Sequence, residues 1–471
     1  MSSSDIESTP KRQKLPPAIS LLFEQKDVWI NGILPFLGMG HFAFVGAVNK
    51  QMKQLYQEYC DSVKNPPDVF VEAYHSRKRR TTSYDTSYRA AFCNVACAEY
   101  WYYSDNSDTR RPRHASVTQA IAKVGSQQVL QWSQEKGFPW DENTCYVAAL
   151  HGRLEILIYA RQHGCRWDKR TCSVAAERGH LHVLKWAREN GCQWDTGTCS
   201  AAAGGGHLEV LKWARENGCP WDAATTSRAA LGGHLHVLKW ARENNCPWNG
   251  STCFSAASKG HLEVLIWARE NGCQWHSHAV HSPTAWAAAR HGHLECLKYA
   301  RRNGCPWDEG TCAGAARGGY LEILKWARTN GCRWNVKTCI RAAETGHVEV
   351  LDWALKNGCP MNLDICAGAA RLGYLKALKC ARDNGCPWGS TTCHMAASGG
   401  HLEVLKWAHE NGCSWGVSTC HGAAGNGHLE CLKYAHGNGC PWDFQTCDFA
   451  RMNGHAELLK WAKDNGCPDT E

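Results

Sequence analysis

The sequence lacks the features that mark several large classes of protein. No apolar run approaches the roughly 18 residues that a membrane-spanning helix needs, and the polar start at Met1 does not resemble a signal peptide. The motifs G-x-x-x-x-G-K-[ST], G-x-S-x-G and H-E-x-x-H are absent, as is any C-x-x-C pair. These absences predict a cytoplasmic protein that is not an enzyme, needs no cofactor and does not bind a membrane.

Charge is also not concentrated in the way that nucleic-acid binding requires. The 52 Lys and Arg residues and the 44 Asp and Glu residues leave a formal net charge of +8, which is spread thinly along the chain. A nucleic-acid-binding protein is expected to gather its basic residues on one face. The sequence therefore predicts no nucleic-acid partner. Two short basic clusters, 11–14 and 77–80, leave nuclear import as an alternative to a purely cytoplasmic location.

Three residue types are abundant instead: 28 Cys, 23 Trp and 44 Gly. Many of the cysteines recur at intervals of 27 residues, in two series that are separated by one step of 32 residues. This regularity predicts a repeat array over 111–466, with thirteen units of which the first, 111–137, is degenerate. The two series are Cys165, Cys192, Cys219, Cys246 and Cys273, then Cys305, Cys332, Cys359, Cys386, Cys413, Cys440 and Cys467.

One unit illustrates how each repeat is expected to fold. Asp195 can cap the first turn of a helix whose small residues, such as Cys199 and Ala203, recur with helical spacing. Gly206 is expected to end this helix, and residues 207–217 then form a second, amphipathic helix. Such a helical hairpin is too small to bury its own apolar face, so it must stack on its neighbours. The predicted fold class is all-α, a solenoid of about thirteen stacked helix pairs.

The repeated run T-C-x-x-A-A-x-x-G-H-L-E-V-L-K-W-A-R-E-N-G-C resembles the ankyrin consensus T-P-L-H-x-A-A-x-x-G-H. It departs from that consensus in its period of 27 instead of 33 residues, and in the reduction of T-P-L-H to Thr-Cys. The six missing residues belong where ankyrin repeats carry a β-hairpin finger. The resemblance therefore implies shortened, pseudo-ankyrin repeats. It also implies protein binding by the first helices and the loops before them, which line the concave groove of ankyrin proteins.

The region before the repeats carries a second resemblance. Residues 1–18 are predicted to be disordered, and 19–60 to form a small helical segment. Apolar residues within 21–56 resemble the F-box runs I-L-x-x-L and V-x-x-x-W-x-x-L, without the opening Leu-Pro and with Met in place of Trp. This resemblance implies a substrate adaptor that docks a Skp-type linker of a cullin ubiquitin ligase, and the alternative is a segment that caps the array. The F-box-like residues are Ile33, Leu34, Leu37, Val48 and Met52.

The repeated Cys, Trp and His residues allow a chemical and a structural interpretation. Zinc or redox chemistry is conceivable, but cysteine spacings of 7 and 20 residues match no usual zinc arrangement, and buried thiols pack as small apolar groups. The tryptophans are expected to act as spacers between repeats, and the histidines that open the second helices to form hydrogen bonds. The five-residue insertion holds weak metal-site candidates, His276, His278 and His281, for which a solvated loop is the alternative.

Positions that differ from repeat to repeat, before and within the first helices, are the candidates for partner binding. Neutral drift at exposed positions would produce the same variation. The predicted function is a monomeric, non-catalytic scaffold that binds a partner protein on the solenoid surface. The alternatives are the ubiquitin-ligase adaptor and a metal- or redox-active cysteine-rich protein. Residues 61–110 are assigned to a linker or a degenerate repeat, and 467–471 to a C-terminal tail. The candidate partner-binding residues are Lys169, Arg170, Phe254, Ile340, Arg341, His394, Met395, Asp448 and Phe449.

Overall fold

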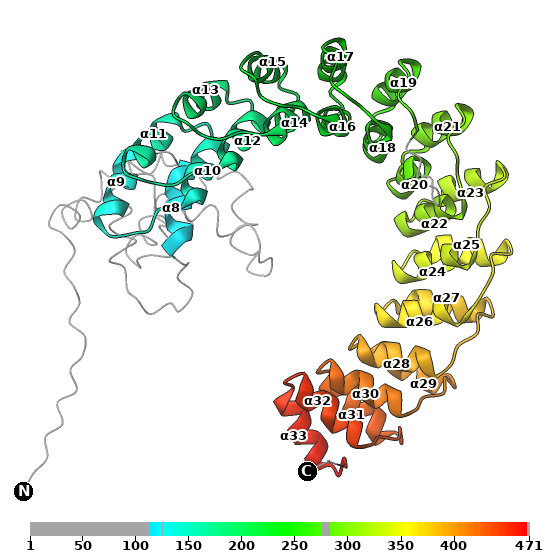
Figure 1. Cartoon of the computed structure of the whole chain (residues 1–471). Coiled ribbons are helices and arrows are strands. Elements are labelled where there is room, and N and C mark those ends of the chain that lie inside the picture. The colour runs from blue at the N-terminus through cyan, green and yellow to red at the C-terminus, as the bar shows by residue number, and fades with distance from the viewer. Residues whose placement is uncertain (1–113, 125, 276–282, 469–471) are drawn as a thin grey trace, which may run out of the picture. The chain divides into compact units, whose positions relative to one another are not determined.

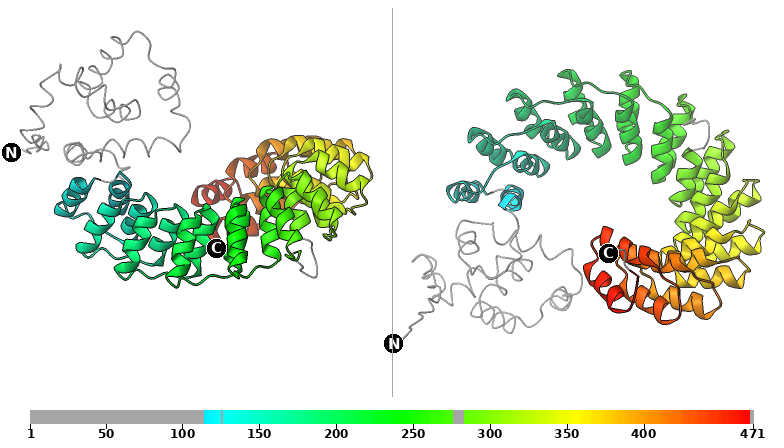
Figure 2. Two further views of the ribbon diagram at one scale, coloured as in Figure 1. Left: turned by 90° about the horizontal axis from the view of Figure 1, so that it is seen from above. Right: turned by 60° about the horizontal axis from the view of Figure 1, so that its bottom comes forward.

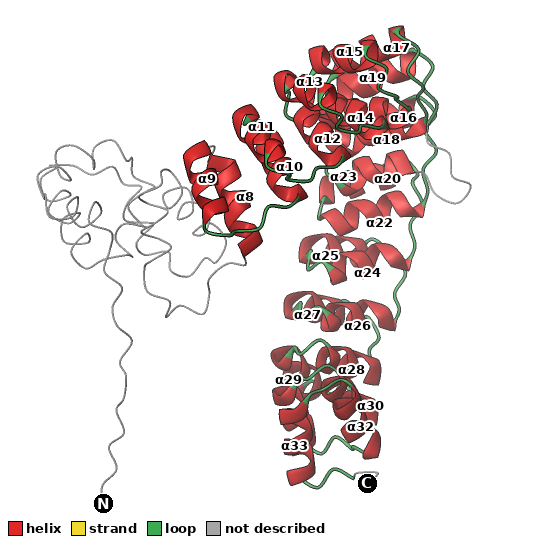
Figure 3. Cartoon of the chain, turned by 60° about the vertical axis from the view of Figure 1, so that its left-hand side comes forward, coloured by secondary structure: helices red, strands yellow, loops and turns green. Residues whose placement is uncertain are grey.

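The computed structural model describes residues 114–124, 126–275 and 283–468 of the chain. These residues form 26 helices and contain no strand (Figure 3). The chain divides into two compact units, Met1–Pro220 and Trp221–Glu471. In the described residues, four helix pairs lie in the first unit and nine in the second.

The helices of the first unit are α8 (His114–Val124), α9 (Gln127–Glu135), α10 (Glu142–Leu150), α11 (Leu154–Gln162), α12 (Lys169–Glu177), α13 (Leu181–Glu189), α14 (Thr196–Gly205) and α15 (Leu208–Glu216). Those of the second unit begin with α16 (Ala223–Gly232), α17 (Leu235–Glu243), α18 (Gly250–Lys259), α19 (Leu262–Glu270), α20 (Pro283–Arg290), α21 (Leu294–Arg302), α22 (Glu309–Gly318), α23 (Leu321–Thr329) and α24 (Val336–Glu344). They continue with α25 (Val348–Lys356), α26 (Leu363–Arg371), α27 (Leu375–Asp383), α28 (Ser390–Ser398), α29 (Leu402–Glu410), α30 (Val417–Gly425), α31 (Leu429–Gly437), α32 (Phe444–Met452) and α33 (Ala456–Asp464).

The predicted fold class, an all-α solenoid of about thirteen stacked helix pairs, is confirmed. Within each unit the even-numbered helices lie side by side in one layer and the odd-numbered helices form a second layer (Figure 1, Figure 2). We call these the first-helix layer and the second-helix layer. In the second unit, the first helices from α16 to α26 follow the inside of the curve (Figure 1).

Several predictions concern residues outside the described ones. The predicted segments 1–18, 19–60 and 61–110 are among them, so the domain boundaries stay predictions. The F-box-like residues Ile33, Leu34, Leu37, Val48 and Met52 also lie outside the described residues.

Most first helices begin at a capping side chain, as the sequence predicts. In α14, Oδ1 of Asp195 accepts a hydrogen bond from the Gly197 amide at 2.9 Å. Gly206 follows this helix with a φ of 79°, in the left-handed region that glycine adopts without the steric cost of a Cβ atom. The predicted start and end of this helix are therefore confirmed. Gly389 and Gly416 stand in the capping position before α28 and α30, where no side-chain cap forms.

Each second helix ends in a turn that satisfies its last carbonyl groups. After α15, the Asn217 side chain donates to the Trp213 carbonyl at 2.8 Å, and the Cys219 amide donates to the Ala214 carbonyl at 2.9 Å. The Arg215 guanidinium then donates to the Cys219 carbonyl. This turn leaves few polar backbone groups unpaired. Because the same turn recurs, the chain leaves the second helix of each repeat in a similar direction.

The first helices pack closely because their buried residues are small. Consecutive first helices contact each other directly within each unit, whereas most consecutive second helices approach each other less closely. Each pair is therefore a wedge that is narrower in the first-helix layer, and stacked wedges produce a curve. The buried residues of α14 illustrate the small size: they are Thr198, Cys199, Ala202 and Ala203.

An aromatic ladder fills the wider space between second helices. In the first unit, Trp194 follows α13 and lies under the Arg188 guanidinium, 4.1 Å from its ring centroid. The same ring meets Trp213 of α15 edge-on, with the centroids 5.8 Å apart. One turn tryptophan thus contacts two consecutive second helices through a cation–π and an aromatic contact.

One repeat of the second unit lacks both aromatic residues of the ladder, and the packing changes there. Met361 occupies the turn position and Cys380 the helix position. In this repeat α25 and α27 approach more closely than other consecutive second helices of the described residues. Asn384, after α27, donates directly to the Asp352 carboxylate of α25 at 3.0 Å. Smaller side chains let the helices come together, which supports the predicted spacer role of the aromatic rings.

A histidine couples consecutive repeats at the start of most second helices. Nε2 of His180 lies 3.3 Å from the Leu150 carbonyl oxygen at the end of the preceding first helix. Its ring also covers Gly152, where a Cβ atom would lie 2.7 Å from Nδ1. Burial lowers the pKa of His180, so the ring is neutral at pH 7. The predicted hydrogen-bonding role of the histidines is confirmed at this position.

We expect Gly179→Ala to destabilise the chain more than Gly191→Ala. Both glycines have a positive φ, of 75° and 84°, so alanine costs either position about 1 kcal/mol of backbone strain. Only at Gly179 would the new Cβ atom also lie 2.6 Å from Nδ1 of His207, whereas nothing lies within 4 Å at Gly191. The free energy of unfolding, measured by urea denaturation, should fall by about 1–3 kcal/mol more for Gly179→Ala. Equal losses would contradict the coupling of His207 to the preceding repeat.

Candidate functional site

The exposed face of the first-helix layer carries side chains that differ among repeats. Phe254 on α18, Ile340 on α24 and Met395 on α28 are partly exposed, and the exposed fraction of Phe449 on α32 is 38%. The predicted partner-binding residues thus lie along this face in different repeats, and the structure does not bring them into one site.

Some of the predicted partner-binding residues also have partners within the chain. Their side chains hold the start of a first helix, connect consecutive repeats or form a pair within one first helix, so part of their variation has a structural reason. The contacts are Lys169 with Asp195 at 2.6 Å, Arg170 with Asp168 at 2.7 Å, His394 with the Ser418 carbonyl at 2.6 Å, and Asp448 with Arg451 at 2.5 Å.

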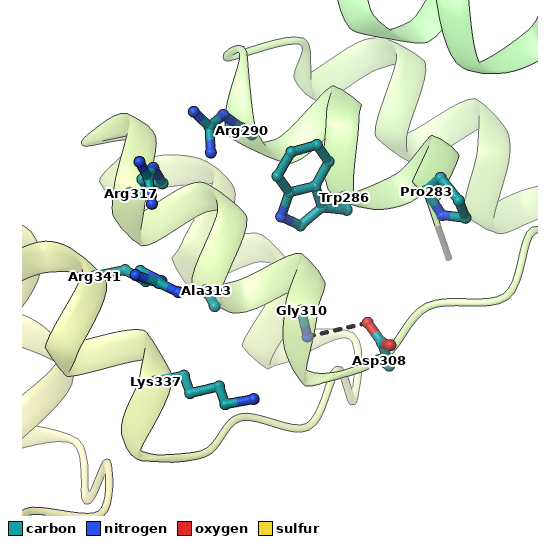
Figure 4. A pocket seen from close by; sticks show the side chains of 9 residues that line it. All are labelled: Pro283, Trp286, Arg290, Asp308, Gly310, Ala313, Arg317, Lys337 and Arg341. Atoms are coloured by element: carbon teal, nitrogen blue, oxygen red, sulfur yellow. Dashed lines mark hydrogen bonds between the residues drawn. The ribbon is translucent and has the colours of Figure 1, made fainter. Parts of the chain in front are cut away.

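A pocket of about 370 Å³ lies on this face in the second unit, among α20, α22 and α24 (Figure 4). One aromatic side chain and four basic side chains surround it, and small residues of α22 lie between them (Figure 4). We call it the basic pocket. Its lining residues are Pro283, Trp286, Arg290, Asp308, Gly310, Ala313, Arg317, Lys337 and Arg341.

The basic pocket exists because α22 presents small residues between α20 and α24, whose side chains at the pocket are larger. Gly310, Ala313 and Arg317 recur with helical spacing and share one face of α22. Phe254 occupies the position of Ala313 in another repeat, where its ring would fill the corresponding space. Gly314 is also suited to its place, because a Cβ atom there would lie 3.0 Å from Cδ1 of Trp286.

Positive charge in the basic pocket exceeds the negative charge beside it. Arg290 lies over the Trp286 ring at 5.1 Å, and no carboxylate pairs with Arg290, Arg317 or Lys337 within the described part of the chain. Arg341 pairs with Glu344 at 2.6 Å. Burial and the nearby charges of Arg317 and Arg341 lower the pKa of Arg290. Like charges therefore lie close together here without full compensation.

The acidic residues near the basic pocket are already engaged. Oδ1 of Asp308 accepts a hydrogen bond from the Gly310 amide at 3.0 Å and so caps α22. Glu344 binds Arg341 through one oxygen and Arg371 of α26 through the other, at 3.0 Å. Its side chain is only 16% exposed. Asp308 thus holds the start of α22, and Glu344 is shared between two arginines.

Most of the basic pocket was missed by the sequence-based prediction. Arg341 was predicted as a partner-binding residue, whereas Trp286, Arg290, Arg317 and Lys337 were not. One signal in the sequence could have found them. Trp286 occupies neither of the two tryptophan positions of the repeat, and it is the only tryptophan within a first helix of the described residues.

Comparison with known proteins finds a similar family for part of the array. Residues 339–409 match the family model described as ankyrin repeats (many copies). Within these residues the chain is similar to ankyrin repeats. The predicted resemblance is thereby confirmed for this segment, and the F-box-like resemblance stays a prediction. No curated protein sequence matches the chain.

Two solved structures are among those that match the chain. The ankyrin repeat domain of human ASB11 has 20% sequence identity and a TM-score of 0.29, over 34% of this chain and 84% of that domain. The pentatricopeptide repeat protein PPR10, in complex with an 18-nucleotide psaJ RNA element, has 14% identity and a TM-score of 0.33, over 96% of this chain and 74% of that protein.

Two further findings concern possible metal ligands and membrane-spanning helices among the described residues. No three His, Cys, Asp or Glu side chains of the described residues lie grouped so that they could hold a metal ion. The candidates His276, His278 and His281 lie outside the described residues. Among the helices of the described segments, none is long and apolar enough to cross a membrane.

The cysteines of the described repeats belong to the core. All 25 cysteines in the described residues are buried. Those that close a repeat also reach the backbone at the start of its first helix: Sγ of Cys192 lies 3.4 Å from the Asp168 carbonyl oxygen, and Sγ of Cys332 lies 3.3 Å from that of Asp308. The predicted packing role of the cysteines is confirmed for these positions.

We expect Cys296 and Cys366 to react slowly with alkylating reagents while the chain is folded. Burial raises the pKa of Cys296 to about 11 and that of Cys366 to about 12. The thiolate is the reactive form, and at pH 8 about one thiol in a thousand or fewer is ionised at such a pKa. Peptide mass spectrometry after brief alkylation should find both cysteines unmodified in the native chain and modified in urea. Rapid native modification would contradict the packing role.

Proposed function

We propose that this chain is a non-catalytic scaffold that binds a partner protein through the exposed face of its first-helix layer. Ankyrin repeats indicate a protein-interaction scaffold, and helical repeat folds are typically non-enzymatic. One observation favours this particular face. The second helices repeat nearly the same run, L-E-V-L-K-W-A-R-E, whereas exposed positions of the first helices differ from repeat to repeat. A surface that only holds neighbours together needs the same side chains each time, but recognition needs different ones.

Rigidity of the stack supports the same proposal. The aromatic ladder and the histidine contacts fix consecutive repeats of one unit against each other, so exposed side chains of the first helices are held in place before a partner arrives. Binding then loses less conformational entropy than it would on a flexible surface. Several apolar side chains are exposed on first helices of the second unit, among them Leu363 at 47% and Met452 at 79%. We propose a monomeric, cytoplasmic scaffold, with nuclear import as the alternative location.

Site-specific photo-crosslinking can locate the partner. A benzophenone amino acid placed at Phe254 or Phe449, in the first-helix layer, should form covalent adducts with partner proteins in cells. The same amino acid at Lys239 or Lys406, both on second helices, serves as the matched control and should form few adducts. Mass spectrometry of the adducts identifies the partner. Adducts that form mainly from Lys239 and Lys406 would refute binding by the first-helix face.

A second candidate function is that of a substrate adaptor for a cullin ubiquitin ligase. Its support is the F-box-like pattern of Ile33, Leu34, Leu37, Val48 and Met52 in residues 21–56. In this proposal, those residues dock a Skp-type linker and the ankyrin repeats hold the protein to be modified. The third interpretation, metal or redox chemistry, loses support because the described thiols are buried.

We expect Leu37→Asp to abolish capture of a Skp-type linker and a cullin by the full chain. A charge placed in a desolvated apolar interface costs several kcal/mol, because nothing there replaces its water. Leu363→Asp adds the same charge at an exposed position of α26 and should leave capture unchanged. Circular dichroism on both variants checks that the repeats stay folded. If the wild-type chain captures no linker, the adaptor function is wrong.

A further inference from the structure

We propose that the basic pocket binds an acidic segment of a partner protein, with its carboxylates on the arginines and a neighbouring apolar side chain against Trp286. The proposal rests on the proposed scaffold function and names the chemistry of the partner. It is carried by three features that coincide at one place: an open hollow, a group of uncompensated cations, and a tryptophan, which no other described first helix contains.

Charge complementarity is the first argument. Arg290, Arg317 and Lys337 reach the pocket from three consecutive first helices and have no carboxylate partner in the described residues. Elsewhere on the described surface lysines often pair with nearby acids, as Lys325 does with Glu322 at 2.8 Å. Arginine presents a planar fork of donors that binds a carboxylate through two hydrogen bonds. An acidic ligand would therefore supply the compensation that the chain itself lacks.

The aromatic wall is the second argument. Trp286 is partly exposed and lines the basic pocket from α20. It does not belong to the aromatic ladder, because other residues occupy the turn and second-helix positions of that ladder. Its indole therefore separates no second helices, and the ladder does not explain it. Arg290 lies over the ring at 5.1 Å, which holds both groups in place before a ligand arrives. An indole beside two arginines favours a ligand that carries an apolar or aromatic group next to its acids.

The extent of the positive charge favours a peptide over a nucleic acid. A nucleic acid needs basic residues along a continuous path, because each phosphate carries a charge. Here the row of cations is interrupted on both sides of the pocket, and Arg371, which takes the same helix position as Arg317 on α26, pairs with Glu344. Arg290 and Arg317 occupy the same position in two consecutive repeats. The repeat before Arg290 has Ser258 at this position, and the repeat after Arg317 has Glu344. A short acidic stretch of polypeptide matches a cluster that spans three repeats, whereas a strand of nucleic acid would meet the carboxylate of Glu344 beside the pocket.

Panning of a random peptide library on the immobilised full chain tests the proposal without a known partner. Peptides of about twelve residues that bind the wild-type chain should be enriched in Asp and Glu, with an aromatic or large apolar residue nearby. Labelled copies of the selected peptides then give dissociation constants by fluorescence anisotropy. Raising the salt concentration well above about 0.1 M should weaken their binding, because ions screen the contacts with the arginines.

Three variants test whether these peptides occupy the basic pocket. Arg317→Glu should weaken binding by about tenfold or more, because it replaces a bidentate partner by a repelling charge. Ala313→Phe should block the hollow without a change of charge, and Phe254 in another repeat shows that a first helix accepts phenylalanine there. Arg228→Glu is the matched control, because it makes the same charge change on an exposed residue of α16, outside the basic pocket. It should leave binding nearly unchanged.

Several outcomes would overturn the proposal. Selected peptides without an acidic bias would do so, and so would acidic peptides that lose affinity equally with Arg228→Glu and Arg317→Glu. Binding of a labelled oligouridylate that is lost in Arg317→Glu and in Ala313→Phe, together with no acidic bias in the peptides, would assign the pocket to RNA instead. Adducts from Phe254 and Phe449 in the crosslinking experiment would preserve the scaffold function in each of these cases. Thermal unfolding of each variant confirms that the loss is not one of folding.

Discussion

The difference in side-chain size between the two helix layers is the constraint on which the rest of the structure depends. Buried alanines and cysteines let consecutive first helices touch, whereas aromatic rings hold most second helices apart. A ladder contact such as Arg188 over Trp194 contributes only about 0.5–1 kcal/mol at an exposed site. Burial of Leu211 contributes about 2 kcal/mol or more. The core therefore supplies most of the stability, and the ladder decides the angle between neighbouring repeats. Where Cys380 replaces the ring, α25 and α27 move together and the angle is set by smaller groups.

The shorter repeat changes how neighbouring repeats pack and which residues can bind a partner. Compared with ankyrin repeats of 33 residues, the period of 27 leaves no room for a long finger between the repeats. In its place, a closing cysteine such as Cys192 lies against the carbonyl group of the preceding helix cap, Asp168. A thiol is a weak hydrogen-bond donor, so its main contribution is its small buried volume. Recognition is then left to side chains on the first helices themselves, whose positions are fixed by the stack.

The sequence predicted well what every repeat contains and poorly what only one repeat contains. The capping role of Asp195, the glycine at 206 and the burial of the cysteines follow from patterns that recur in register, so each copy confirms the others. The basic pocket depends on residues that occur once. Trp286 and Lys337 lie far apart in the sequence, and their proximity requires knowledge of which helix positions face outward and how neighbouring helices pack. The closer approach of α25 and α27 likewise follows from two substitutions that only the packing connects.

In a rigid stack of repeats, smaller side chains on the surface of one helix can create a binding site. The position of Ala313 holds Phe254 in another repeat, and the helix forms with either residue because the position lies outside the core. Small residues on α22 therefore open a hollow without any loss of core packing. The cations around it do carry a cost, because Arg290 is partly buried near Arg317 and Arg341, and arginine stays charged at physiological pH. Selection for stability alone would favour acidic neighbours here, as it does for Lys325 beside Glu322. Charge left uncompensated in such a place is better explained by a ligand that brings the missing acids than by the fold.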